Sequence, residues 1–69
     1  MIKYDIYHVN GICYRVNLSK SWDVLAEYYN PYLDAFRTSG LTAAHVILHR
    51  KAVLVGRNVV FKVGRLCSQ

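Results

Sequence analysis

Five of the chain's nine aromatic residues and three of its four acidic residues lie in one stretch, 21–39, with the sequence SWDVLAEYYNPYLDAFRTS. The large apolar residues of this stretch recur at steps of three and four, which lines one side of a helix. They are Trp22, Leu25, Tyr29, Leu33 and Phe36. The spacing predicts an amphipathic helix, with Trp22, Leu25, Leu33 and Phe36 buried against a sheet.

A proline interrupts this predicted helix. Inside a helix, Pro31 removes one backbone hydrogen bond and clashes with the preceding turn, at a cost of about 3 kcal/mol. Asn30 can cap a new helix in which Pro31 occupies the first turn. Ser21 is a suitable cap for the first helix, and Gly40 is a suitable end for the second. We therefore expect two short helices or one kinked helix.

The N-terminal segment predicts a β-hairpin around Asn10-Gly11. A two-residue loop would place Asp5 opposite Val16 and scatter polar residues over both faces of the hairpin. A three-residue loop, 9–11, with a bulge at its glycine makes one face almost wholly apolar. On the other face it pairs Asp5 with Arg15. We expect the three-residue loop.

Two interpretations compete at 43–51. Thr42 could cap a helix there, whereas the density of valine, isoleucine and leucine favours one long strand over 45–55. The segment that follows predicts a second hairpin, with Gly56-Arg57 in a type II′ turn. In that register Lys51 lies directly opposite Lys62, and an anionic partner would relieve the repulsion between them.

The predicted elements combine into an α+β fold. An N-terminal hairpin, a central kinked helix and a C-terminal hairpin give a ββαββ order, with the helix across one face of an antiparallel sheet. The alternative is a winged-helix-like arrangement with a third helix at 43–51. We expect the first, because the density of β-branched residues outweighs one capping threonine. No repeat or linker interrupts the sequence, so 1–69 is expected to be a single domain.

The sequence favours a reducing, cytoplasmic location. Its N-terminus lacks the apolar core and cleavage site of a secretory signal, and no apolar run is long enough to span a bilayer. Cys13 and Cys67 are therefore expected to be free thiols, although a disulfide between them would help so small a domain. A homodimer or a bound partner would also add to the marginal stability of 69 residues.

The formal net charge of +5 is unevenly distributed, because no acidic residue follows Asp34. The second half is therefore a cationic surface, which either serves solubility or binds an anionic partner. The tyrosines of the predicted helix cannot all face inward, so at least one is an exposed candidate anchor. The candidate binding residues are Arg50, Lys51, Arg57, Lys62, Arg65, Tyr28 and Tyr32.

No catalytic or metal-binding motif of high specificity occurs in the sequence. His45 and His49 would share one face of a helix, but two ligands do not make a zinc site. Asp5, His8 and Cys13 come nearest to a nucleophilic group, yet the preferred hairpin register places His8 and Cys13 on opposite faces. We expect no enzymatic activity, no cofactor and no metal.

These features favour a small non-enzymatic regulatory or inhibitory protein. It would bind the acidic surface of a larger protein or nucleoprotein through the aromatic helix and the basic C-terminal hairpin. The alternative is a winged-helix-like protein that binds DNA directly. The two hypotheses differ in salt dependence, because neutralising phosphates makes affinity fall steeply with salt. A membrane is not expected as a partner.

Overall fold

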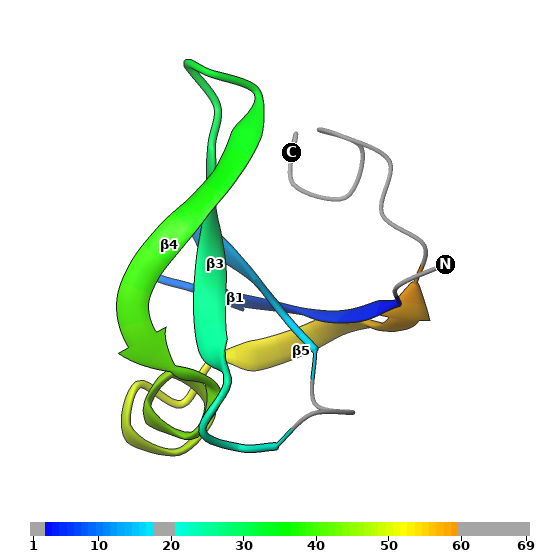
Figure 1. The fold of residues 1–69 in the computed structure, drawn as a ribbon, viewed down its shortest axis with the longest axis vertical. Helices are drawn as coiled ribbons and strands as arrows, with labels where there is room; N and C mark the ends of the chain where they lie inside the picture. The colour runs from blue at the N-terminus through cyan, green and yellow to red at the C-terminus, as the bar shows by residue number, and fades with distance from the viewer. Residues whose placement is uncertain (1–2, 18–20, 60–69) are drawn as a thin grey trace.

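The computed structural model describes residues 3–17 and 21–59 (Figure 1). This part of the chain forms five β-strands and one short helical segment, η1. In chain order they are β1 (Tyr4–Val9), β2 (Ile12–Val16), β3 (Leu25–Asn30), β4 (Ala35–Thr42), η1 (His45–His49) and β5 (Val53–Val59). The fold is therefore essentially all-β, and the predicted ββαββ arrangement is wrong. No helix within the described ranges is long and apolar enough to cross a membrane.

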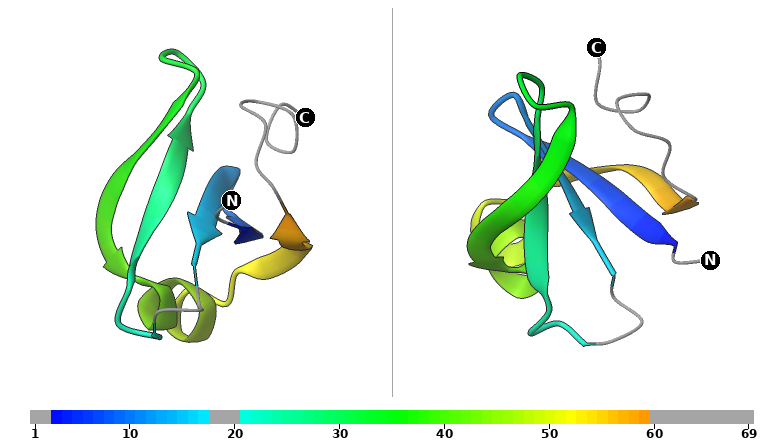
Figure 2. Two further views of the ribbon diagram at one scale, coloured as in Figure 1. Left: turned by 45° about the vertical axis from the view of Figure 1, so that its right-hand side comes forward. Right: turned by 45° about the horizontal axis from the view of Figure 1, so that its top comes forward.

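The five strands form one antiparallel sheet in the order β4-β3-β2-β1-β5. Strands β1 to β4 follow one another across the sheet, and η1 then returns the chain to the far side of β1. The sheet is strongly twisted, so that β3 and β4 cross the direction of β1 and β5 (Figure 1). Both views of Figure 2 show the helical segment at one end of the sheet, beside the end of β4.

The first hairpin has a two-residue loop, so the predicted three-residue loop is wrong. Asn10 and Gly11 both have positive φ, 51° and 76°, as a type I′ turn requires. The register places Val9 opposite Ile12 and Tyr7 opposite Tyr14. The right-handed twist of the strands matches this turn, so the local Asn-Gly preference determines the register.

A hairpin with one apolar face is not needed, because this sheet buries residues on both faces. Ile6 and Tyr7 are neighbours on β1 and point to opposite faces, yet both are buried. The polar side chains obtain partners on other strands instead of facing each other. Asp5 accepts a hydrogen bond from the backbone N–H of Asn58 at 2.8 Å. Arg15 pairs with a carboxylate on β3 and not with Asp5.

The predicted central helix is a second hairpin, β3 and β4, joined by the loop 31–34. A strand places Tyr28 and Tyr29 on opposite faces, where each can pack, whereas a helix would have to leave one aromatic side chain outside. Pro31 is harmless in the loop but would be costly inside a helix. Asp34 has a φ of 48°, a conformation that closes a loop and does not occur within a helix.

The predicted aromatic stripe is therefore not a buried core. Trp22, Leu25 and Leu33 have exposed fractions of 49%, 51% and 57%. Phe36 is half-buried, and its ring centroid lies 5.5 Å from that of Tyr29. The expectation that all four predicted core residues are buried is wrong.

The core lies between the sheet and the helical segment. Six buried residues from four parts of the chain form it: Tyr7, Tyr14, Val16, Ala26, Ala43 and Val46. The turn that leads into η1 is bound to the loop before β3, since the backbone N–H of Ala43 donates to the carbonyl of Val24 at 2.8 Å. Thr42 Oγ1 accepts the backbone N–H of His45 at 3.1 Å, as expected of a cap.

Of the two interpretations of this segment, the helix is the correct one. The preferred strand over 45–55 is wrong, because His45–His49 are helical and β5 begins only at Val53. The winged-helix-like alternative is nevertheless wrong, because the segment before it is a strand and not a helix. The backbone N–H of Arg50 bonds to the carbonyl of His45 at 3.1 Å, five residues back, which is the hydrogen bond of a π-helix.

The predicted C-terminal hairpin does not form at Gly56-Arg57, because β5 runs through both residues and pairs with β1. The register shifts on either side of the pair between Ile6 and Gly56. A glycine within a strand is typical of such a bulge, so Gly56 marks a bulge in β5 and not the turn of a hairpin. Lys62 lies outside the described residues, and the register that placed it opposite Lys51 is wrong.

The turn at Asn10-Gly11 gives a first prediction. Gly11→Ala should lower the free energy of unfolding by about 1 kcal/mol, because a side chain at positive φ is strained. An added Cβ would meet no other atom within 4 Å, so the loss reports backbone conformation alone. Urea denaturation measures it. Asn10→Gly is the control and should cost less, since glycine accepts the φ of 51°. An unchanged Gly11→Ala variant would contradict the two-residue turn.

The helical segment gives a second prediction. Val46 is fully buried, and Val46→Ala should lower the free energy of unfolding by about 2 kcal/mol through lost burial and a residual cavity. Leu48, two residues later in η1, is 65% exposed, so Leu48→Ala should change it by less than about 0.5 kcal/mol. Thermal melts of both variants make the comparison. Equal losses would mean that η1 does not pack on the sheet as described.

Candidate functional site

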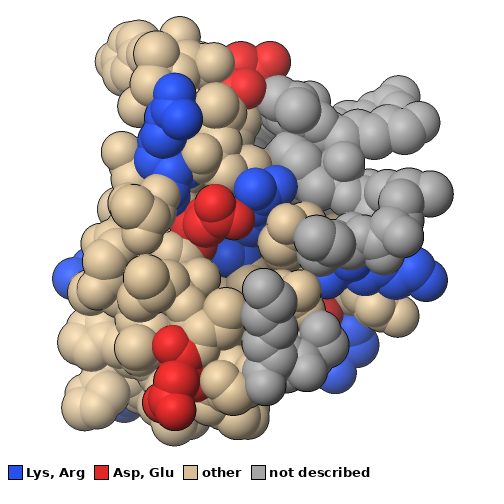
Figure 3. All heavy atoms as spheres, viewed as in Figure 1, with Lys and Arg blue, Asp and Glu red and all other residues tan. Residues whose placement is uncertain are grey.

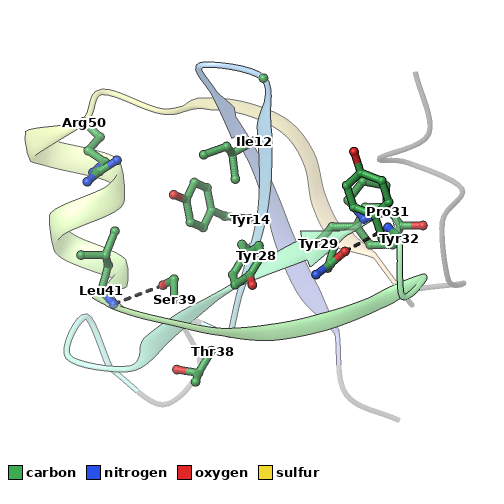
Figure 4. Close-up of a pocket in the computed structure, with 12 residues that line it drawn as sticks. Ile12, Tyr14, Tyr28, Tyr29, Pro31, Tyr32, Thr38, Ser39, Leu41 and Arg50 are labelled. Carbon is green, nitrogen blue, oxygen red and sulfur yellow. Dashed lines mark hydrogen bonds between the residues drawn. The ribbon is translucent and has the colours of Figure 1, made fainter.

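A groove of about 600 Å³ lies on the face of the sheet that carries Tyr14 and Tyr28 (Figure 4). It runs between the first hairpin turn, the 31–34 loop and the end of η1. Its lining consists of Gly11, Ile12, Tyr14, Tyr28, Tyr29, Asn30, Pro31, Tyr32, Thr38, Ser39, Leu41 and Arg50. It is open along one side and is lined mainly by aromatic and aliphatic side chains.

The floor of the groove is part of the core. Tyr14 and Tyr28 are direct partners in the register between β2 and β3, so their side chains stand on the same face. Tyr14 is buried, and Tyr28 is half-buried and packs against the core cluster. These two aromatic side chains are therefore held in place by the same contacts that stabilise the fold.

One rim of the groove is the loop between β3 and β4. The side-chain Oδ1 of Asn30 accepts the backbone N–H groups of Tyr32 and Leu33, at 2.9 and 3.3 Å. This Asx turn fixes the loop from its first residue. Tyr32 is 96% exposed, and it stands at the rim beside Pro31 in Figure 4. The loop thus presents an aromatic ring to solvent on an ordered backbone.

A bulge in β4 forms the opposite wall. Between the pairs Leu25–Thr42 and Glu27–Thr38, strand β4 has two more residues than β3. Ser39 Oγ donates to the carbonyl of Ala26 at 2.7 Å and accepts the backbone N–H of Leu41 at 3.1 Å. These bonds stabilise the bulge, which contributes Leu41 to the groove lining.

Among the described residues that line the groove, Arg50 is the only charged one. It lies at the helix end, across from Ile12 (Figure 4). It makes no ion pair with another residue of the described ranges. The ion pair found there joins Arg15 Nε to Glu27 Oε1 at 2.8 Å. The guanidinium of Arg15 also lies over the ring of Phe36, 4.2 Å from its centroid. Arg15 is thus a structural cation, whereas the Arg50 charge is available to a ligand.

The structure brings together three of the seven predicted binding residues. Arg50, Tyr28 and Tyr32 line the groove, although neither the predicted aromatic helix nor the predicted hairpin at Gly56-Arg57 forms. The other described candidates, Lys51 and Arg57, are exposed and do not line it. Lys62 and Arg65 lie outside the described residues.

Sequence reasoning missed the contributions of Tyr14 and Leu41. Tyr14 lies on β2, and its direct partner Tyr28 on β3 continues the same face of the sheet, a pairing that the predicted central helix excluded. Leu41 reaches the groove through a bulge that includes Gly40, which has a positive φ of 73°. This glycine was expected to end a helix. A glycine between the two β-branched residues Thr38 and Thr42 was the available signal for a bulge in a strand.

Basic side chains do not form one continuous patch on the face viewed in Figure 3, where uncharged and acidic surface separates them. Lys51 follows η1, whereas Arg57 lies on β5, the edge of the sheet opposite β4. The predicted cationic surface therefore includes residues of separate elements.

The structure also places the groups that were considered for catalysis or metal binding. His45 and His49 are stacked, with ring centroids 5.2 Å apart. No cluster of three metal-ligating side chains occurs among the described residues. His8 and Cys13 are direct cross-strand partners, so their predicted separation on opposite faces is wrong. Cys13 is disulfide-bonded and not the expected free thiol. Cys67, the other cysteine of the sequence, lies outside the described residues.

Comparison of the chain with protein-family models, with curated proteins and with solved structures finds no match. Functional inference for this chain therefore depends on its own geometry.

A hydrogen bond beside the groove gives a third prediction. The hydroxyl of Tyr29 donates to Oδ1 of Asp34, and this bond, together with desolvation and the carboxylate charge, raises the pKa of Tyr29 above its usual value. The contribution of this bond to stability is therefore fully present below the pKa of about 10 that Tyr29 has in the unfolded chain. It is lost as the pH rises through the pKa of Tyr29 in the folded chain. Asp34→Asn should lower the pKa of Tyr29, because the amide does not repel the phenolate.

Carbon-13 NMR of labelled tyrosine, followed against pH, measures this change. Asp23→Asn is the matched control, because Asp23 is exposed and the carboxylate that acts on Tyr29 is that of Asp34, so the Tyr29 titration should stay as in the unmodified chain. A Tyr29 titration that is the same with and without Asp34 would show that the bond does not form in solution.

Proposed function

We propose that this chain is a small non-enzymatic regulatory protein that binds a segment of a larger protein in the tyrosine-lined groove. The observation that supports the proposal is the convergence of Tyr14, Tyr28, Tyr32 and Arg50 from three parts of the chain. Tyrosine and arginine are the residue types most enriched at the energetic centres of protein interfaces. An apolar groove with a few polar groups at its edge is also the usual form of a binding site.

The shape of the groove favours a protein segment over a small molecule. Small-molecule sites bury most of the surface of their ligand, whereas this groove is open along one side. Tyr32 is almost fully exposed at the rim, where only a ligand that extends beyond the floor would cover it. An extended peptide would contact the floor and the rim together.

The charge of the lining favours protein over nucleic acid. A protein that binds DNA or RNA neutralises several phosphates, and within 3–17 and 21–59 Arg50 is the only charged lining residue. The carboxylate of Asp34 is bonded to the lining residue Tyr29, and it would repel a phosphate backbone. Stacking of bases on tyrosine is favourable, but it usually accompanies a positively charged path for the backbone.

The fourth prediction tests this function with peptides selected from a displayed library of random linear sequences. Tyr32→Ala should weaken the binding of a selected peptide about tenfold, as expected for loss of an aromatic anchor. Since Tyr32 is 96% exposed, the variant should unfold at an unchanged temperature. Isothermal calorimetry measures the affinity.

Leu33→Ala is the matched control, because Leu33 is an exposed neighbour that does not line the groove. Equal affinity of the unmodified chain and Tyr32→Ala would contradict the proposal. So would a library without binders, and tight, strongly salt-dependent binding of single-stranded oligothymidine would then favour nucleic acid.

A further inference from the structure

We infer that the segment bound in the groove carries a carboxylate side chain, Asp or Glu, that pairs with Arg50, next to a large apolar side chain seated on Tyr14 and Tyr28. The inference depends on the proposed function and adds the chemistry of the ligand. It derives from an apolar floor that ends at a single cation.

The first step is the state of Arg50 itself. Within the described ranges Arg50 has no ion-pair partner. Arg15, on β2, is by contrast paired with Glu27 and lies over the rings of Tyr4 and Phe36. No acidic residue of the described part of the chain lines the groove with Arg50. A cation beside an apolar surface attracts an opposite charge strongly, because the surface excludes part of the screening water.

The second step is the position of the arginine. Its backbone is fixed at the end of η1 by the bond from its N–H to the carbonyl of His45. The planar guanidinium offers two parallel N–H groups, which fit one carboxylate. Lys51, the next residue, is exposed and adds positive charge beside it. Phosphorylated ligands are usually held by several arginines, so one arginine in the lining favours a carboxylate.

The third step is the apolar part of the ligand. Tyr28 is half-buried, and Ile12, on the Arg50 side of the groove, is 37% exposed. Leu41 adds aliphatic surface on the β4 wall. A large aliphatic or aromatic side chain would bury this surface, and an acidic residue close to it in sequence would reach Arg50.

The chain itself is a poor source for such a ligand. Residues 60–69 include Lys62 and Arg65 and no acid, so their side-chain charges repel Arg50. A second copy of the chain would bring another net charge of +5. Charge complementarity therefore favours an acidic segment of a different protein.

A charge exchange tests the inference on peptides selected from the random library. We expect the selected peptides to share an acidic residue, and Arg50→Glu to weaken their binding at least about tenfold. Replacing the shared acid by lysine should weaken binding to the unmodified chain and restore binding to Arg50→Glu. Circular dichroism verifies that each variant is folded.

Lys3→Glu is the matched control. It makes the same change in charge at an exposed residue before β1, at the end of the first hairpin away from its turn, and it should leave affinity nearly unchanged. Selected peptides without a shared acid, or equal losses in Arg50→Glu and Lys3→Glu, would overturn the inference. If Tyr32→Ala still weakened the binding of those peptides, the proposed function would stand without the inference about a carboxylate. A library that yields no binder overturns both.

Discussion

The register of β1 with its two neighbours is the constraint on which the rest of the structure depends. β1 pairs with β2 through the tight Asn10-Gly11 turn and with β5 from the far end of the chain. Because Ile6 and Tyr7 are buried on opposite faces, a shift of one residue would exchange the contents of both faces. The bulges of β5 accommodate this fixed register, and the Asp5 carboxylate binds the backbone N–H of Asn58 beside them.

The groove depends on the same arrangement. Tyr14 and Tyr28 can line one floor because β2 and β3 are paired in a register that places them side by side. Their inner surfaces pack on the core that η1 completes, so stability and binding use the same two side chains. Tyr32 and Arg50 differ, because both are exposed and can be changed with little effect on folding. This division makes the binding proposals testable separately from the fold.

Local sequence signals predicted part of this structure. The Asn-Gly turn located the first hairpin, and Thr42 offered the helical interpretation, although the strand was preferred there. Tyr28, Tyr32 and Arg50, which were chosen as binding candidates, line one groove. The helix over 21–39 was wrong because the four-residue step from Leu25 to Tyr29 also fits an alternating strand, and the Asn30-Pro31 turn separates this strand from the next one. The course of β5 could not be predicted from local pattern, since its partner β1 lies some fifty residues away and supplies the hydrogen bonds that override the turn preference of Gly56-Arg57.

Cross-strand nuclear Overhauser contacts test the central claim most directly, namely that 25–42 is a β-hairpin beside β2 and that this pairing forms the aromatic floor. The structure predicts backbone contacts from Tyr28 to both Tyr14 and Arg37, the partners of its two neighbouring strands. A helix over the same residues would instead give contacts between residues three and four apart across 25–36. That second pattern, observed in the folded chain, would contradict both the fold and the groove.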